Sequence, residues 1–348
     1  MKVLMVIDSK FSGNPFISTL CQQLNKKNID TTMSLEKLWS SAGDYDIIHF
    51  HWPEAIYRWR SNITADEVTY LDKTINKAKQ KGTKIVITCH NLKPHTINTQ
   101  NVISIYEIIY KYADLFLHMG NYSLQYLISR YPYAKHCILP HHIYNSIYKF
   151  DKSKTECRNI LGLDQSKCNI LCFGEFRNSK ERKTIIKLTN KFKNQNIIFT
   201  TPGFYRKKII TRRIWEIPQR IINTIYYKAL GIKFNNHFLN EKITETYFCA
   251  ADIVLIQRLQ ILNSGNLPMA YAAGKIVVGP NIGNVGEILL QTENPVFDPN
   301  NLDSISRAIN KAIELQKTNL GFNNKEYAIK NWSEEMITEK LIQYYTEI

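Results

Sequence analysis

The sequence lacks the signatures of several common protein classes. Its seven cysteines form no C-x-x-C pair and no His/Cys cluster, which argues against both a disulfide framework and a zinc site. No apolar run approaches the roughly 18 residues that a membrane span needs. The apolar stretch in MKVLMVIDSK is too short for the core of a secretory signal and predicts a first strand. We therefore expect a cytoplasmic chain with reduced cysteines.

Three widespread nucleotide and hydrolase motifs are also absent. The sequence has no G-x-x-x-x-G-K-[ST], no G-x-G-x-x-G after its first predicted strand and no G-x-S-x-G. P-loop enzymes, ordinary dehydrogenases and α/β-hydrolases are thus poor explanations of the chain. With 44% hydrophobic residues, 22% charged residues, 14 Gly and 11 Pro, the composition is that of an ordinary globular protein.

Positive charge is in excess. The chain carries 45 Lys and Arg against 30 Asp and Glu, a net charge of +15. This excess predicts attraction to an anionic partner: nucleic acid, an anionic membrane face or a phosphorylated substrate. The segment 206–233 is especially basic, with Ile, Trp and Tyr interleaved. The alternative is a solvated surface in a chain that is rich in Lys, Asn and Ile throughout.

Strand-like and helix-like segments alternate along the chain. Short runs of β-branched and aromatic residues predict strands at 2–7, 45–51, 83–89, 113–119, 168–174, 196–200, 251–256 and 275–280. Helical patterns separate them at 14–27, 64–81, 101–112, 121–130, 179–192, 206–230 and 264–274. Such alternation favours parallel sheets covered by helices on both faces, with ligands at the carboxyl ends of the strands.

A charged break at 145–165 divides this alternation in two. We therefore predict an α/β protein of two doubly wound, Rossmann-like domains that face a cleft. The first domain spans 1–150 and the second 151–330. A final amphipathic helix, 331–348, begins after a Ser333 cap.

The sequence HFHWPE, residues 49–54, ends the second predicted strand. Strand periodicity places His49 and His51 on one face, and Trp52 and Glu54 follow at the exit. An aromatic ring beside a carboxylate and imidazoles suits a carbohydrate, whose ring face stacks and whose hydroxyls need an acceptor or a base. The alternative is a pair of buried histidines bonded to backbone, beside a core tryptophan.

Two further loops follow predicted strands in the first half. His90 and Asn91 come directly after 83–89, and Gly13 stands just before the first helix. A glycine there lets the backbone approach a ligand, although an ordinary turn explains it equally. Histidines at two neighbouring strand ends could bind a metal, but no zinc-like spacing completes a site, so we expect no metal.

Two loops of the second half suit an anion. Arg177 and Lys180 lie beside one helix start, and Ser264, Gly265 and Asn266 lie at another. Two cations and a group of backbone amides at one sheet edge would neutralise a leaving diphosphate without a metal, which is the main demand of nucleotide-sugar chemistry. Each loop alone is equally explained by a helix cap and a surface pair.

The motifs follow one another in a recognisable order. Along nearly the whole chain stand DIIHFHWPE, TCHN, ILPHH, FGEFRNSK, AADIVLI, NSGNLPMAYAAGKIVVGPNIG with a following GE, and a helix that contains Trp-Ser. This order resembles the GT-B glycosyltransferases, specifically the bacterial family 4-like enzymes of capsule and exopolysaccharide assembly. The resemblance implies an acceptor-binding first domain, a second domain that binds a UDP- or GDP-linked sugar, and a last helix that crosses back onto the first domain.

The resemblance also assigns roles to individual residues. It implies donor contacts from Arg177 and Lys180 to the diphosphate, from Ser264, Gly265 and the neighbouring Asn266 at a phosphate-binding helix, and from Glu287 to the ribose, with Gly13 facing the cleft. It also places His90, a catalytic candidate, beside the transferred sugar. Acceptor contacts would come from His49, Trp52 and Asn91. Glu287, in the glycine-rich PNIGNVGEIL, also reads as a ribose acceptor by itself, because one carboxylate can accept from two hydroxyls.

The chain departs from the family pattern at several positions. Ile261 and Met269 replace two glutamates that usually lie eight residues apart, Glu181 replaces a glycine, and Gln257 and Arg258 replace a proline and an aromatic residue. The stereochemistry therefore stays open. An inverting enzyme needs a general base, for which Glu54 or His51 is the candidate, whereas in a retaining enzyme these side chains would position the acceptor.

The resemblance implies partners as well. Acceptors in such pathways are glycans, commonly linked to polyprenyl diphosphate, and 206–233 would then hold the protein on the anionic inner face of the cell membrane. A nucleotide-sugar epimerase of the same architecture is one rival interpretation. A non-catalytic basic module that binds membrane or nucleic acid is another, but no RNP, KH or zinc-finger pattern supports nucleic acid.

Overall fold

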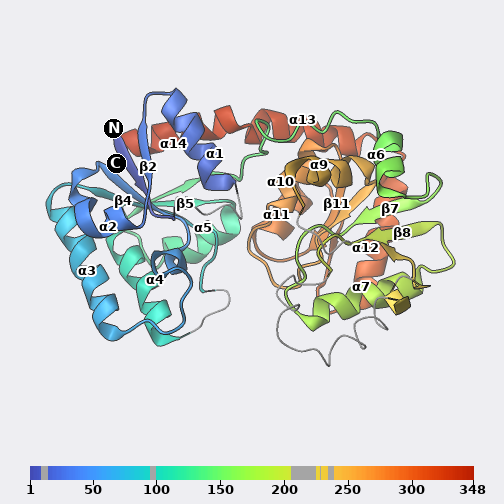
Figure 1. Ribbon diagram of the computed structural model, residues 1–348, viewed down its shortest axis with the longest axis horizontal. Coiled ribbons are helices and arrows are strands. Elements are labelled where there is room, and N and C mark those ends of the chain that lie inside the picture. Colours follow the sequence, from blue (N-terminus) through green and yellow to red (C-terminus); the bar gives the residue numbers. More distant parts are fainter. Residues whose placement is uncertain (9–14, 95–98, 205–224, 228, 234–238) are drawn as a thin grey trace. The chain divides into compact units, whose positions relative to one another are not determined.

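The computed structural model describes residues 1–8, 15–94, 99–204, 225–227, 229–233 and 239–348. Figure 1 shows the chain with its elements labelled. It divides into two compact units: the first consists of Met1–His142 with Trp332–Ile348, and the second of Ile143–Asn331. Gly13 and most of the basic segment 206–233 lie outside the described residues, so the predictions made for them stay predictions.

The first unit is built on a sheet of six parallel strands in the order β2-β1-β3-β4-β5-β6. The strands are β1 (Lys2–Met5), β2 (Asp30–Met33), β3 (Ile47–Phe50), β4 (Lys84–Thr88), β5 (Leu115–His118) and β6 (Lys135–Ile138). The helices are α1 (Phe16–Lys26), α2 (Glu36–Ser41), α3 (Ala65–Gln80), α4 (Gln100–Tyr112), α5 (Asn121–Ile128) and α14 (Glu334–Thr346), with short 3-10 turns η1 (Ala42–Asp44) and η2 (Pro53–Tyr57). Every side chain of β3 and β5 is buried, as expected when helices cover both faces.

The second unit has a similar sheet of six parallel strands in the order β12-β11-β10-β7-β8-β9. The strands are β7 (Cys168–Leu171), β8 (Ile197–Thr200), β9 (Ile232–Lys233), β10 (Ile253–Leu255), β11 (Ile276–Pro280) and β12 (Val296–Phe297). The helices are α6 (Lys154–Leu161), α7 (Ser179–Lys191), α9 (Glu241–Ala250), α10 (Asn266–Ala272), α11 (Gly283–Gln291), α12 (Leu302–Leu315) and α13 (Leu320–Trp332). Its core includes Phe176, Phe199 and Phe204.

Strand order fixes where each unit can bind a ligand. In unit 1 the order reverses between β1 and β3, and in unit 2 it reverses between β7 and β10. In open parallel sheets the loops at such a reversal diverge, so a crevice forms outside the carboxyl ends of these strands. The loops after β3, β7 and β10 carry HFHWPE, FGEFRNSK and the pair Gln257 and Arg258.

The predicted fold class, α/β with two doubly wound parallel sheets, is confirmed for both sheets. The prediction missed β9 and β12, the two-residue strands at the edges of the second sheet, and also β2 and β6, which lie at the edges of the first sheet. Both strands are only partly buried and carry polar residues, DTTM in β2 and KHCI in β6. Edge strands need no continuous apolar run, because one side and much of each face stay in water.

The last helix, α14, belongs to unit 1. It begins as predicted after Ser333, whose hydroxyl accepts a hydrogen bond from the Met336 amide at 3.3 Å. It lies against α1, and Gln23 of α1 donates to the Glu334 carboxylate at 2.7 Å. None of the described helices is both long and apolar enough to cross a membrane.

Candidate functional site

Two histidines meet at the carboxyl ends of β3 and β4. His51 Nδ1 lies 3.1 Å from His90 Nε2, and Trp52 stacks on the His90 ring with centroids 4.3 Å apart. Burial lowers the pKa of both imidazoles well below 6.5, and the charge of another histidine, His49 for His51 and His51 for His90, lowers it further. Both rings are therefore neutral at physiological pH. His51 Nε2 is buried and has no hydrogen-bond partner among the described residues.

Glu54 lies in η2, directly after this loop, and is only 6% exposed. Its Oε2 has no hydrogen-bond partner in the described part of the chain, and neither has the buried hydroxyl of Tyr106. Burial raises the pKa of the Tyr106 phenol, and the charge of Glu54 beside it raises that pKa further. A buried carboxylate with an unused oxygen is costly unless a ligand or a proton supplies the missing bond.

His49 is held entirely by the fold. Its Nδ1 lies 2.6 Å from the Tyr345 hydroxyl of α14, and its Nε2 lies 2.8 Å from the Thr88 hydroxyl of β4. Burial, with a smaller contribution from the charge of His90, lowers the pKa of His49 to about 3. Neither ring nitrogen is left for the acceptor contact that the sequence suggested, because both already bind hydroxyls of this unit.

Three rings that sequence reasoning did not assign to the site complete the aromatic surroundings. Phe16 of α1 lies against His90, with centroids 5.1 Å apart, and stacks on His142 at 4.8 Å. His141 lies 4.6 Å from the same phenyl ring. The motif ILPHH contained the signal for both histidines, but nothing in their spacing tied them to residues more than 40 positions away.

Asn91 follows His90, and its carbonyl accepts a hydrogen bond from the Tyr110 hydroxyl at 3.3 Å. The residue thus helps to hold the loop after β4 against α4. In the described ranges no group of three or more His, Cys, Asp or Glu side chains is arranged to hold a metal ion.

In unit 2 a carboxylate organises the loop after β7. Glu181 occupies the third position of α7, where the Asn178 side chain caps its amide at 2.9 Å. The Glu181 carboxylate is buried and accepts a hydrogen bond from the Arg177 amide at 2.7 Å. Its Oε2 also lies 3.1 Å from Nη1 of Arg258, at the end of β10. The loops at the strand-order reversal are therefore bonded to each other.

The two cations predicted for this loop, Arg177 and Lys180, lie in different surroundings. Arg177 is exposed, and its positive charge acts on the guanidinium of Arg258. Lys180 is also exposed, but its ammonium donates to the Asn300 side chain at 2.9 Å. Arg177 rather than Lys180 therefore shares its surroundings with the end of β10.

The loop before α10 is joined to the same strand ends. Asn266, the first residue of α10, donates from its side-chain amide to the Phe173 carbonyl at 2.8 Å, and Gln257 donates to that carbonyl at 3.1 Å. Gly265 precedes the helix with no side-chain cap, and the Ser264 carbonyl accepts from the Leu267 amide at 3.2 Å. The side-chain amide of Asn266 is thus engaged in positioning this loop.

Glu287 lies one turn inside α11 and is partly buried. One of its carboxylate oxygens accepts a bond from the Gln291 side chain at 3.3 Å. α11 starts at Gly283, where φ is +58° and an added Cβ would lie 2.7 Å from the Ile261 carbonyl oxygen. Only glycine fits this close turn, which sets the direction in which α11 leaves β11.

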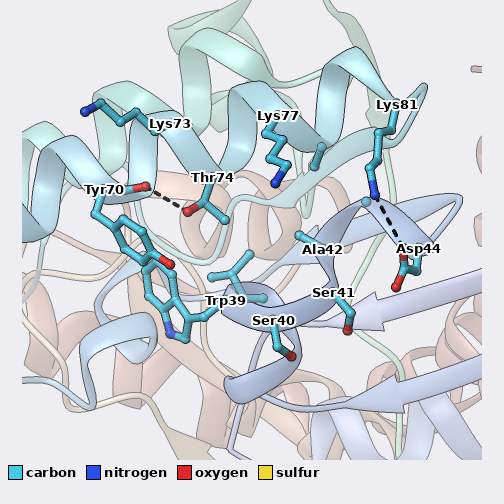
Figure 2. Close-up of a pocket in the computed structure, with 13 residues that line it drawn as sticks. Trp39, Ser40, Ser41, Ala42, Asp44, Tyr70, Lys73, Thr74, Lys77 and Lys81 are labelled. Carbon is cyan, nitrogen blue, oxygen red and sulfur yellow. Dashed lines mark hydrogen bonds and ion pairs between the residues drawn. The ribbon is translucent and has the colours of Figure 1, made fainter.

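A shallow pocket of about 220 Å³ lies elsewhere on unit 1, between α2 with η1 and α3. Figure 2 shows Trp39 stacked on Tyr70, with ring centroids 5.4 Å apart, and Lys81 paired with Asp44 at 3.6 Å. Asp44 precedes β3 and Lys81 precedes β4, so the pocket faces the amino ends of these strands. Neither His51 nor Glu54 lines it, and we give it no part in the chemistry.

The comparisons with known proteins concern the fold. No protein-family model and no curated protein matches this sequence. Among solved structures, the sucrose-phosphate synthase of Thermosynechococcus elongatus matches with a TM-score of 0.75 and 13% identity over 99% of this chain and 98% of that one. HepE from Anabaena, solved in complex with UDP, matches with a TM-score of 0.72 and 15% identity over the full length of both chains. A glycosyltransferase from Rickettsia africae matches with a TM-score of 0.69 and 14% identity.

These matches define the class of fold. The chain has the two-unit α/β architecture of the GT-B glycosyltransferases along its whole length, as the order of its motifs suggested. At such low identity the likeness concerns the fold, and the chemistry has to be argued from the sites.

Proposed function

We propose that this protein is a glycosyltransferase that moves a sugar from a UDP- or GDP-linked donor to a glycan or lipid-linked acceptor. One observation supports it most directly. Arg177 follows β7 at the strand-order reversal of unit 2, in a chain that matches the UDP complex of HepE over its full length. A guanidinium at this edge is suited to the diphosphate of such a donor, because the ligand crevice of a doubly wound sheet lies there.

In this proposal unit 2 binds the donor. Arg177 and Lys180 supply positive charge to the diphosphate, and the loop Ser264–Asn266 supplies backbone amides and a hydroxyl. Glu287 accepts from the ribose hydroxyls. The glycosyl C–O bond breaks toward the diphosphate, on which negative charge accumulates. Fixed cations stabilise that charge in the transition state, so the proposed reaction requires no metal ion.

Unit 1 binds the acceptor in this proposal. The exposed part of the Trp52 ring, which stacks on His90, offers a flat surface to the apolar face of a sugar. Glu54 carries the unused carboxylate oxygen that an acceptor hydroxyl could bind. In an inverting reaction Glu54 takes the proton of that hydroxyl as its oxygen attacks the anomeric carbon. In a retaining reaction Glu54 orients the hydroxyl, and His51 Nε2 is the second candidate for either role.

We further propose that the acceptor is a surface-polysaccharide intermediate held at the inner face of the cell membrane. Support comes from the +15 net charge and from the basic, aromatic segment 206–233. Replacing Lys207, Lys208, Arg212 and Arg213 with Gln should abolish flotation with anionic liposomes at low salt. Unchanged flotation of this variant would remove the membrane from the proposal.

The donor class is tested by thermal shift with UDP, GDP, ADP and CMP, each with Mg²⁺ and with EDTA. A ligand present at 100 times its Kd stabilises the native state by about 2.7 kcal/mol, enough to raise the unfolding temperature measurably. We expect a shift with UDP or GDP in EDTA, lost in Arg177→Gln and retained in Arg307→Gln, which removes an exposed arginine of α12. A folded protein that responds to no nucleotide would contradict the proposed function.

A further inference from the structure

Two departures from the family pattern contact each other in the structure. Glu181 stands where the resemblance implies a glycine, and Arg258 where it implies an aromatic residue. They lie 77 positions apart in sequence, yet Glu181 Oε2 and Arg258 Nη1 are 3.1 Å apart. The side chains are 3% and 14% exposed, respectively. The two substitutions therefore form one unit, a mostly buried ion pair at the strand-order reversal.

The Glu181 carboxylate is fixed before any ligand binds. It sits in the first turn of α7, where the helix dipole favours a negative charge, and it also accepts the Arg177 amide at 2.7 Å. A carboxylate held at two points in turn fixes the guanidinium that it binds. Arg258 is thus positioned by the start of α7 and by β10 together.

The Arg258 guanidinium retains hydrogen-bonding capacity. Glu181 is its one hydrogen-bond acceptor among the described residues, although a guanidinium carries five N–H donors. Burial lowers the pKa of Arg258 to about 10, and the positive charge of Arg177 is the next largest cause. Arg258 stays charged at physiological pH with a second cation nearby. The carboxylates of Glu181 and Glu175 offset part of this repulsion, and an anion bound between the two arginines would offset more of it.

Gln257, next to Arg258 in sequence, also has hydrogen-bonding capacity that the described residues do not use. Gln257 is 4% exposed, and its side-chain amide donates to the Phe173 carbonyl at the end of β7. Its Oε1 is buried and has no hydrogen-bond partner in the described part of the chain. The turn after β10 thus presents an unused acceptor beside a partly used cation, both next to the end of β7.

We propose that Arg258 is a second arginine that binds the donor's diphosphate, together with Arg177, and that Glu181 positions it. The inference rests on the proposed function. Lys180 is less suited to this part because its ammonium is bonded to Asn300. A guanidinium binds two phosphate oxygens at once, whereas an ammonium acts as a point charge. Arg258 would then stabilise the charge that develops on the diphosphate as the glycosyl bond breaks.

The test is calorimetric titration of the full chain with UDP and with uridine. Arg258→Gln should weaken UDP binding by about 10- to 100-fold, the range expected for charged hydrogen bonds. Uridine, which has no phosphate, should bind Arg258→Gln and the wild-type protein with equal affinity. Arg258→Lys should lose part of the affinity for UDP, because lysine keeps the positive charge but cannot bind two phosphate oxygens at once. Arg307→Gln is the matched control and should bind UDP normally.

Arg258→Gln leaves Glu181 buried without its partner and could fail to fold. The double variant Glu181→Gln with Arg258→Gln removes both charges, so it keeps the fold testable. Its UDP affinity should fall as far as that of Arg258→Gln. Normal UDP binding by this folded double variant would overturn the role of Arg258, leaving the proposed function intact. Failure of wild type to bind any nucleoside diphosphate would instead count against the proposed function itself.

Discussion

Acidification should unfold unit 1 in a pH range where most globular domains are stable. Burial is the largest cause of a lowered pKa for six of its histidines: His49, His51, His90, His118, His141 and His142. The sequence of unit 2 contains one histidine, His237, which lies outside the described residues. The two units should therefore respond differently to pH.

The direction follows from proton binding. Above pH 6.5 these histidines are neutral in both the folded and the unfolded chain. As the pH falls below 6.5, the unfolded chain takes up protons, while His49 and His118 in the fold, with pKa values of about 3, do not. Stability that is fully present above pH 6.5 is therefore lost as the pH falls toward 3.

The magnitude is large relative to the stability of a domain. At pH 5 a histidine with a folded pKa of about 3 and an unfolded pKa of 6.5 lowers the free energy of unfolding by about 2 kcal/mol relative to neutral pH. His142, with a pKa of about 4, costs nearly as much. Together with His49, His118 and His141, whose pKa is also about 3, the loss is about 8 kcal/mol, against a usual total of about 5–15 kcal/mol. Carboxylates add little in this range, because they titrate mainly below about pH 4.5.

Tryptophan fluorescence reports on unit 1 selectively. Trp39, Trp52, Trp59 and Trp332 belong to unit 1, and a Trp215→Phe variant removes the fifth tryptophan. Urea unfolding of this variant at pH 7.5, 6.0, 5.5 and 5.0 gives the free energy of unfolding of unit 1 at each pH. The four histidines His49, His118, His141 and His142 predict a slope of about 5 kcal/mol per pH unit near pH 5. A slope below about 1 kcal/mol per pH unit would show that the imidazoles are not held neutral by burial.

Two further predictions concern buried polar contacts. Tyr345→Phe removes the hydroxyl bonded to His49 and leaves Nδ1 of that ring without a partner, so unit 1 should lose about 1–3 kcal/mol in the same urea assay. Tyr70→Phe, at an exposed tyrosine of α3, is the control. Asp252→Ala removes the carboxylate that pairs with Arg158, a residue that is only 2% exposed. The free energy of unfolding of unit 2, measured by hydrogen exchange, should fall by about 3–5 kcal/mol, and that of unit 1 should not change. Wild-type stability in either variant would show that the contact contributes little.

The fold was predictable where packing follows local pattern. The buried strands β3, β4, β5, β7, β10 and β11 all stand within predicted runs, because a strand covered on both faces must be apolar along its length. The edge strands β2 and β6 were missed because they do not meet that demand. The Ser333 cap was predicted correctly, because a helix start satisfies its amides with residues a few positions away.

The candidate site was predictable only in part. Sequence periodicity identified His51 and His90 as residues at neighbouring strand ends, and the structure brings them to 3.1 Å. The sequence could not show that the Tyr345 hydroxyl is hydrogen-bonded to the His49 ring, because these residues are 296 positions apart. The pairing of Glu181 with Arg258 was equally hidden, and both positions had been noted only as departures from a pattern.

By itself, then, the sequence determined the alternation of the buried strands with helices, the doubly wound α/β fold class and the polar residues that follow the strands. These properties depend on neighbours within one or two turns of a helix or one length of strand. The tertiary structure decided which of those polar residues keep a free hydrogen-bonding group. That outcome depends on burial and on partners from distant parts of the chain, as the occupied ring of His49 and the unused oxygen of Glu54 show.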